Sequence, residues 1–116
     1  MIFKNVEIND VGIRDIEVKD IEQNKSELTL IDVRRPDEYV GELGHVKGIK
    51  LLTLENEFKE KIKDFDKDKP IAFICRSGGR STQAALYARD LGFQEVYNMK
   101  GGMIEWNNQK LPIDQD

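Results

Sequence analysis

The chain has 116 residues, of which 39% are hydrophobic and 34% charged, and its formal net charge at pH 7 is −4. This length suits a single domain, residues 1–116, and the composition suits a globular protein with a well-solvated surface. The acidic balance argues against a nucleic-acid-binding module, and no stretch approaches the roughly 20 apolar residues of a membrane helix, so neither nucleic acid nor a membrane is an expected partner.

The first half of the chain is predicted to alternate short strands with short helices. Residues 1–13 are expected to form an N-terminal arm or an edge strand, because Val6 and Ile8 show weak alternation. Pro36 suits the first position of a helix, and the acids that follow it complement the helix dipole. From about residue 14 onward we expect a strand at Arg14–Ile16, helical turns at Val18–Asn24, a buried strand at Leu28–Val33, a helix at Pro36–Val40 and a strand at Ile49–Leu52.

The second half continues this alternation to about residue 112. Spacings of four, four and three separate Leu54, Phe58, Ile62 and Phe65, which predicts one amphipathic helix over Leu54–Phe65. The other expected elements are a strand at Ile71–Ile74, a helix at Ser81–Leu91 closed by Gly92, a strand at Val96–Met99 and a helix at Met103–Asn108. Such alternation predicts an α/β fold with a mainly parallel sheet flanked by helices.

The only cysteine, Cys75, follows the apolar run Ile71–Ile74 directly. A lone cysteine behind an apolar run is usually an inert core residue. Here, however, it precedes a loop whose glycines allow backbone N–H groups to point inward, and the next helix contributes roughly half a positive charge at its N-terminus. Two arginines and no acid lie in the loop, so we expect a thiolate nucleophile beside an anion pocket. The loop residues are Arg76, Ser77, Gly78, Gly79, Arg80 and Ser81.

A single cysteine also limits the compartment, because it cannot form an internal disulfide. The fold therefore does not depend on an oxidising environment. The N-terminal residues lack the apolar segment of a signal peptide, so a cytoplasmic location is expected.

Two further residues are expected to support the site. Asp32 ends a predicted strand, and in parallel sheets such ends gather at one edge. It either orients Arg80 or the loop amides by charge-assisted hydrogen bonds, or is an ordinary aspartate of a surface turn. Arg34 either adds positive potential or is an exposed residue after the strand. His45 is the only histidine, and without a second ligand cluster we expect neither a metal nor a cofactor.

Four segments of the chain resemble, in order and spacing, the motifs of single-domain rhodaneses in the rhodanese-homology superfamily. They are Asp32-Val33-Arg34 with Glu38-Tyr39, then Gly44-His45-Val46-Lys47-Gly48, then Cys75 to Ser81, and last Gly101-Gly102 with Trp106. The resemblance runs from about Arg14 to Pro112, which is nearly the whole chain.

The resemblance implies a five-stranded, mainly parallel sheet with helices on both faces, and sulfur transfer through a cysteine persulfide. In that scheme Cys75 takes the outer sulfur of thiosulfate or a similar anionic donor. The N–H groups of Arg76 to Ser81 hold the persulfide, while Arg76 and Arg80 bind the donor or steady the loop. The acceptor is cyanide, a small thiol or a sulfur-acceptor protein.

Two other functions share this loop chemistry. Phosphatases and arsenate reductases need a longer loop between cysteine and arginine, whereas four residues separate Cys75 from Arg80 here. The smaller cradle favours sulfur over phosphate. A persulfide carrier that docks on a partner and turns over poorly alone remains open, because it would use the same loop.

Overall fold

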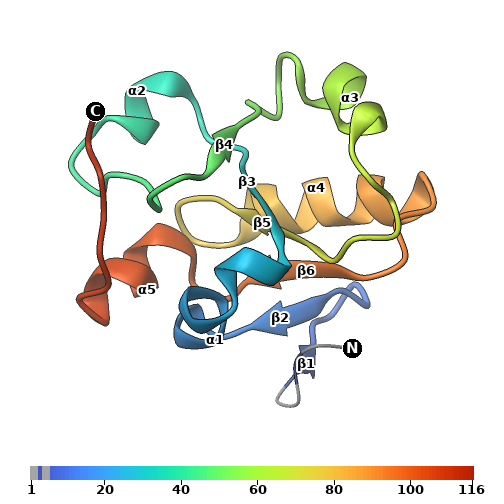
Figure 1. Ribbon diagram of the computed structural model, residues 1–116, viewed down its shortest axis with the longest axis horizontal. Helices are drawn as coiled ribbons and strands as arrows, with labels where there is room; N and C mark the ends of the chain where they lie inside the picture. Colours follow the sequence, from blue (N-terminus) through green and yellow to red (C-terminus); the bar gives the residue numbers. More distant parts are fainter. Residues whose placement is uncertain (1–2, 4–5) are drawn as a thin grey trace.

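The computed structural model describes residue 3 and residues 6–116, and these form a six-stranded sheet with helices on both faces (Figure 1). The strand order is β1-β2-β6-β5-β3-β4, and every pair is parallel except β1 with β2. The strands are β1 (Glu7–Ile8), β2 (Arg14–Ile16), β3 (Thr29–Asp32), β4 (Lys50–Leu51), β5 (Ile71–Ile74) and β6 (Val96–Met99). The α-helices are α1 (Val18–Gln23), α2 (Pro36–Tyr39), α3 (Phe58–Lys61), α4 (Gly79–Asp90) and α5 (Gly102–Asn108), and the 3-10 helices are η1 (Lys25–Glu27) and η2 (Ile62–Asp64).

The expected α/β class is confirmed, and the expected number of strands was one too low. The additional strand is β1, which pairs antiparallel with β2 and places Glu7 opposite Asp15. It comes from the segment predicted to be an arm or an edge strand. Residues 1–2 and 4–5 of that segment lie outside the described residues.

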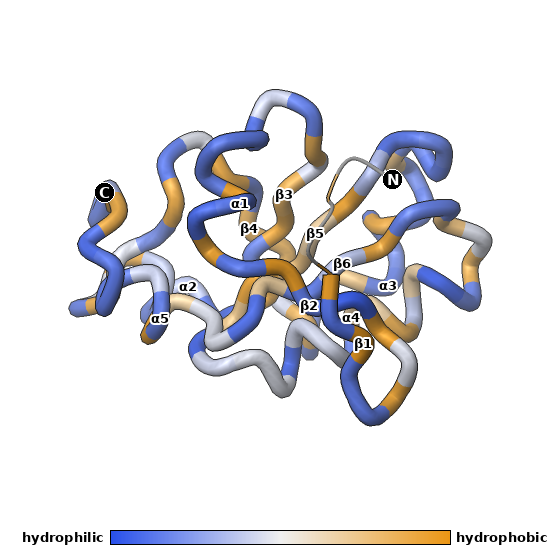
Figure 2. Tube along the Cα trace, turned by 90° about the horizontal axis from the view of Figure 1, so that it is seen from below, coloured by the Kyte–Doolittle hydropathy of each residue, from blue (hydrophilic) through white to orange (hydrophobic). Residues whose placement is uncertain are grey.

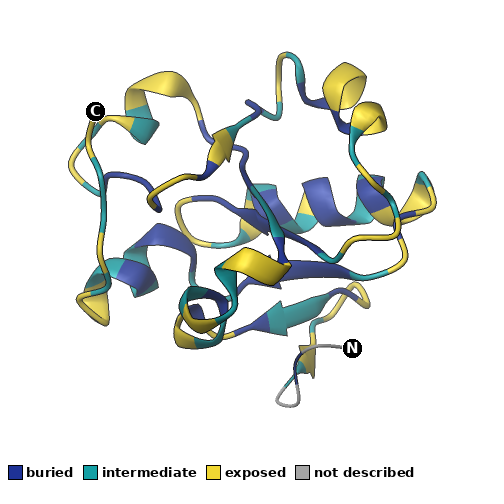
Figure 3. Ribbon diagram, viewed as in Figure 1, coloured by how far each residue is buried: buried dark blue, intermediate teal, exposed yellow. Residues whose placement is uncertain are grey.

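The central strand β5 separates two hydrophobic cores. Ile71 and Phe73 face a cluster with residues of α3 and α4, whereas Ala72 and Ile74 face a cluster with residues of α1 and α5. Both β5 and β6 are buried over their whole length (Figure 3). Hydrophobic segments accordingly lie in the middle of the molecule, with hydrophilic loops around them (Figure 2). Burial on both faces explains why β5 reads as an unbroken apolar run.

The predicted helix over Leu54–Phe65 is shorter than expected, with α3 followed by η2. The preceding backbone is held against the end of β3, since Leu52 N donates to Asp32 O at 2.9 Å and Leu54 N to Val33 O at 3.0 Å. A residue bound in this extended arrangement cannot also begin a helix. Phe58 and Ile62 are nevertheless fully buried, so the apolar pattern correctly indicated which side chains face the core.

Within the described residues, α4 is the longest helix at 12 residues, and no helix is long and apolar enough to cross a bilayer.

Candidate active site

Cys75 lies at the carboxyl end of β5, next to the ends of β3 and β6, and its exposed fraction is only 1%. Parallel strands bring their carboxyl ends to one edge of the sheet, where loops form binding sites. The chain then turns through Arg76 to Gly78 into α4, whose first residue is Gly79 rather than the predicted Ser81. Arg80 and Ser81 therefore belong to the first turn of the helix.

The loop directs two donors at the sulfur of Cys75. Gly78 N–H donates to Sγ at 3.0 Å, and the Ser81 hydroxyl lies 3.2 Å from the same atom. Gly78 has a φ of +121°, a conformation that residues with a side chain rarely adopt. No acidic residue lies in the first turn of α4, so its N-terminal dipole adds to the positive potential. The arrangement can stabilise negative charge on Sγ.

The N-terminus of helix α5 is hydrogen-bonded to the backbone at the start of the loop. Met103 N donates to Cys75 O at 2.9 Å, and Ile104 N donates to Arg76 O at 3.1 Å. This close approach requires glycine at position 102, because a Cβ there would lie 2.5 Å from both carbonyl oxygens. Gly102, which belongs to the glycine pair of the motif, thus lets the N-terminus of α5 bind the carbonyl groups of Cys75 and Arg76.

Arg80 is bound to Glu38 of α2. Its Nη1 and Nη2 donate to the two carboxylate oxygens at 2.6 and 2.8 Å, which fastens the start of α4 to α2. The hydrogen bond from Arg80 lowers the pKa of Glu38 from 4.5 to about 2. The sequence predicts Glu38 as an acid in the first turn of a helix and as part of a motif, but it does not indicate Arg80 as its partner.

Asp32 and Arg34 form a buried pair, with exposed fractions of 0% and 1%. Arg34 donates from its backbone N, Nε and Nη2 to the Asp32 carboxylate, and it also binds the carbonyls of Glu38 and Gly44. The prediction that Asp32 orients Arg80 or the loop amides was therefore wrong, because Arg34 occupies its carboxylate. The pair instead holds α2 and the turn at Gly44, and so places Glu38 beside Arg80.

A pocket of about 240 Å³ opens beside the loop. Arg76 lies on its wall and is exposed, and no hydrogen bond or ion pair of its guanidinium is found within the described part of the chain. The full lining is Arg34, Asp37, Glu38, Gly41, Glu42, Leu43 and Arg76. Cys75 is not part of this lining, which holds three acids and two arginines, and Arg34 is already paired with Asp32. Arg76 is therefore the cation of this lining that can meet a small anion near the loop.

Asn98 on β6 is not among the site residues predicted from the sequence. Its Oδ1 accepts a hydrogen bond from the Ser81 hydroxyl beneath the first turn of α4, and its exposed fraction is 4%. A polar residue in the otherwise apolar strand Val96–Met99 was the available signal.

One group in the described part of the chain has donor atoms for a metal ion, namely His45, Asp114 and Asp116, whose ligand atoms lie within 4.8 Å of one another. His45 already has a structural role. Its Nδ1 bonds to Tyr39 O at 2.7 Å, and its ring stacks on that of Tyr39 with centroids 3.6 Å apart. This group is separate from the loop of Cys75.

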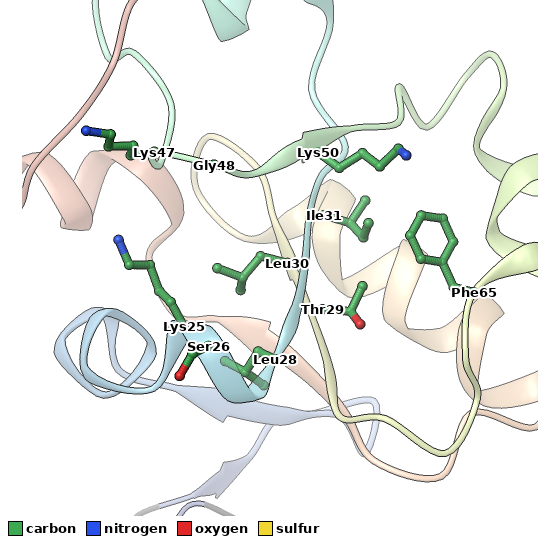
Figure 4. A pocket seen from close by; sticks show the side chains of 10 residues that line it. All are labelled: Lys25, Ser26, Leu28, Thr29, Leu30, Ile31, Lys47, Gly48, Lys50 and Phe65. Atoms are coloured by element: carbon green, nitrogen blue, oxygen red, sulfur yellow. The ribbon is translucent and has the colours of Figure 1, made fainter.

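A second pocket, of about 250 Å³, lies beside β3 and the segment leading into β4 (Figure 4). The side chains of Lys25, Lys47 and Lys50 surround it, while Leu30, Ile31 and Phe65 supply apolar surface. None of its lining residues belongs to the loop of Cys75.

The sequence of this chain matches a family of known proteins over most of its length. Residues 17–109 match the family described as Rhodanese-like domain. The chain is 38% identical over 80 residues to the YqhL protein of Bacillus subtilis (strain 168), a match that covers 69% of this chain and 61% of that protein, so it spans less than two thirds of this relative. It is 34% identical over 87 residues to the thiosulfate sulfurtransferase GlpE of Vibrio cholerae serotype O1 (strain M66-2), covering 73% and 77% of the two chains.

A solved structure agrees with these sequence matches. A rhodanese-related protein from Thermoplasma volcanium superposes with a TM-score of 0.79 at 28% identity, covering 88% of this chain and 98% of that chain. The resemblance drawn from the four motifs is thereby confirmed.

Proposed function

This chain belongs to the rhodanese-like domain family, and we propose that it is a sulfurtransferase in which Cys75 carries the transferred sulfur as a persulfide. The observation that carries the proposal is the pair of donors directed at the buried Sγ, from Gly78 N at 3.0 Å and the Ser81 hydroxyl at 3.2 Å. A nucleophile held at a strand end by such donors is stabilised in its charged form.

The first half-reaction loads the cysteine. Thiosulfate approaches the loop past the exposed guanidinium of Arg76, and the Cys75 thiolate attacks its outer sulfur. The sulfur–sulfur bond of the donor breaks, and sulfite leaves with the electron pair. The relative from Vibrio cholerae is named a thiosulfate sulfurtransferase, which supports thiosulfate as the donor.

The second half-reaction unloads the cysteine. Cyanide or a thiolate attacks the outer sulfur of the persulfide, and the Cys75 thiolate leaves. The donors from Gly78 and Ser81 stabilise this leaving group as they stabilise the attacking thiolate.

The engagement of Arg80 supports sulfur chemistry over phosphate chemistry. A phosphatase needs the arginine of its loop to bind the tetrahedral phosphate through both guanidinium nitrogens. Here both terminal nitrogens of Arg80 are bound to Glu38 at 2.6 and 2.8 Å. This agrees with the short loop between Cys75 and Arg80.

Steady-state sulfur transfer from thiosulfate to cyanide tests the proposal. Wild type should form thiocyanate, and Cys75→Ser should fall to the rate without protein. The control is Asn24→Leu, at a partly buried position whose amide bonds to Asp20 O and not to the loop, and it should keep wild-type activity. Equal rates in wild type and Cys75→Ser would exclude Cys75 as the nucleophile, and hydrolysis of an aryl phosphate dependent on Cys75 would overturn the reaction class. Rapid loading without turnover would instead identify a persulfide carrier.

A further inference from the structure

We propose that Asn98 is a positioning residue for Cys75, acting by competing with its sulfur for the single proton of the Ser81 hydroxyl. The inference rests on the proposed role of Cys75 as nucleophile. It assigns a task to a buried polar side chain on β6 that the two half-reactions do not use.

The Ser81 hydroxyl is fully buried and has three acceptors around it. Cys75 Sγ and Gly78 O each lie 3.2 Å from its oxygen, and Asn98 Oδ1 is the closest. A hydroxyl has one proton to donate, so it can serve only one of these acceptors well at a time. Which acceptor receives the proton therefore depends on whether Cys75 is a thiol or a thiolate.

The orientation of the Asn98 amide is set by Asp15. Asn98 Nδ2 donates to Asp15 Oδ1 at 2.9 Å across the β2–β6 pair, in which the two residues are register partners. A carboxylate can only accept, so the NH₂ group must face Asp15 and Oδ1 must face Ser81.

Asn9, in the turn between β1 and β2, holds Asp15 in place at the outer end of this series of hydrogen bonds. Its Nδ2 donates to the same Asp15 oxygen at 3.2 Å, and its Oδ1 accepts from the backbone N–H of Val11 and Ile13 at 3.2 and 3.0 Å. The N-terminal hairpin is thereby linked to the nucleophile through the side chains of Asn9, Asp15, Asn98 and Ser81.

The direction of the Ser81 hydrogen bond depends on the charge of the Cys75 sulfur. When Cys75 is a neutral thiol, its S–H can donate to the Ser81 oxygen while the Ser81 proton goes to Asn98. When Cys75 is a thiolate, Sγ can only accept, and the Ser81 proton turns from Asn98 to the sulfur. Asn98 thus stabilises the thiol, and Ser81 stabilises the thiolate. Removing the Asn98 side chain should therefore favour the thiolate of Cys75, and removing the Ser81 hydroxyl should favour the thiol.

The test is the pH profile of Cys75 alkylation by iodoacetamide, which reports on this residue alone because the chain has one cysteine. Ser81→Ala should shift the profile to higher pH by roughly one unit, the size expected for one hydrogen bond to a charged group. Asn98→Leu should shift the profile in the opposite direction, to lower pH. The double variant should match Ser81→Ala, because Asn98 acts only through the Ser81 hydroxyl.

Two comparisons keep the test decisive. Asn24→Leu removes a partly buried amide that bonds to Asp20 O at 2.8 Å in α1, and its profile should match wild type. Asn98→Ala should show the same shift as Asn98→Leu and replaces it if the leucine variant does not fold. The inference would be overturned if the Asn98 variants had the wild-type pH profile of alkylation, or if replacing Asn98 shifted that profile equally with and without the Ser81 hydroxyl. Alkylation needs no sulfur donor, so a failure of sulfur transfer would not be mistaken for either result.

Discussion

Arg80 and Glu38, which are 42 residues apart in the chain, form a bidentate ion pair. The pair joins the first turn of α4 to α2 beside the Cys75 loop. The two side chains have exposed fractions of 26% and 15%, so water screens the pair only partly. Its geometry leaves Arg76 as the arginine of the loop that faces the pocket.

Replacing Glu38 with glutamine should destabilise the fold in a pH-dependent way. Its folded pKa of about 2 lies below its ordinary 4.5, so its contribution is complete above pH 4.5 and is lost as the pH falls towards 2. Allowing for partial exposure, we expect Glu38→Gln to lower the free energy of unfolding by about 1–2 kcal/mol at pH 7. Urea unfolding at pH 7 and pH 2.5 should show this difference shrinking, whereas Glu60→Gln, at an exposed position of α3, should show little effect at either pH. An equal loss at both pH values would contradict the ion pair.

Replacing Arg76 should weaken donor binding more than it slows the chemistry. The guanidinium lies on the pocket wall and is exposed, so it acts on the anion through a partly screened charge. Arg76→Ala should raise KM for thiosulfate roughly fivefold, equivalent to about 1 kcal/mol, with a smaller change in kcat. Arg76→Lys should keep most of the affinity. An unchanged KM in Arg76→Ala would show that the donor binds elsewhere.

Adding a methyl group at Gly102 should disturb the loop directly. The new Cβ would lie 2.5 Å from the carbonyl oxygens of Cys75 and Arg76, so either α5 or the loop must move. Gly102→Ala should cost more than about 2 kcal/mol of stability and slow Cys75 alkylation. The matched control is Gly48→Ala, where φ is +79° but nothing lies within 4 Å of the added atom. It should cost only about 1 kcal/mol of backbone strain, and equal losses in thermal unfolding would refute the close contact.

The neighbouring arginines 34 and 35 should differ sharply in their effect on stability. Arg34 is 1% exposed and paired with Asp32, so Arg34→Leu leaves a buried carboxylate without its partner and should cost about 3–5 kcal/mol. Arg35 is 57% exposed, and its surface ion pairs are worth less than about 1 kcal/mol. Urea unfolding of Arg34→Leu and Arg35→Leu measures both, and similar losses would argue against the buried pair.

Local sequence patterns were sufficient where burial alone determines the structure. The run Ile71–Ile74 reads as a strand because both of its faces are buried, and the position of Cys75 at its carboxyl end follows from chain order. By contrast, α3 is shortened by backbone hydrogen bonds from Leu52 and Leu54 to the end of β3. A tertiary contact of that kind leaves no trace in apolar spacing.

The partners of polar side chains could not be predicted, because they depend on how distant segments meet. The sequence leaves Asp32 either to orient Arg80 or the loop amides or to be an ordinary turn aspartate, yet its buried carboxylate is bound by Arg34, only two residues along the chain. Arg80 instead binds Glu38, and Ser81 meets Asn98, which is 17 residues away in sequence. Residue types indicated which groups need partners, and only the fold decides which partners they have.

The most direct test of the central claim is the intact mass of the protein after brief treatment with thiosulfate and removal of small molecules. Wild type should gain the mass of one sulfur atom and lose it again on addition of cyanide, while Cys75→Ser should gain nothing. Folded wild-type protein that gains no mass, or an equal gain in Cys75→Ser, would contradict a persulfide on Cys75.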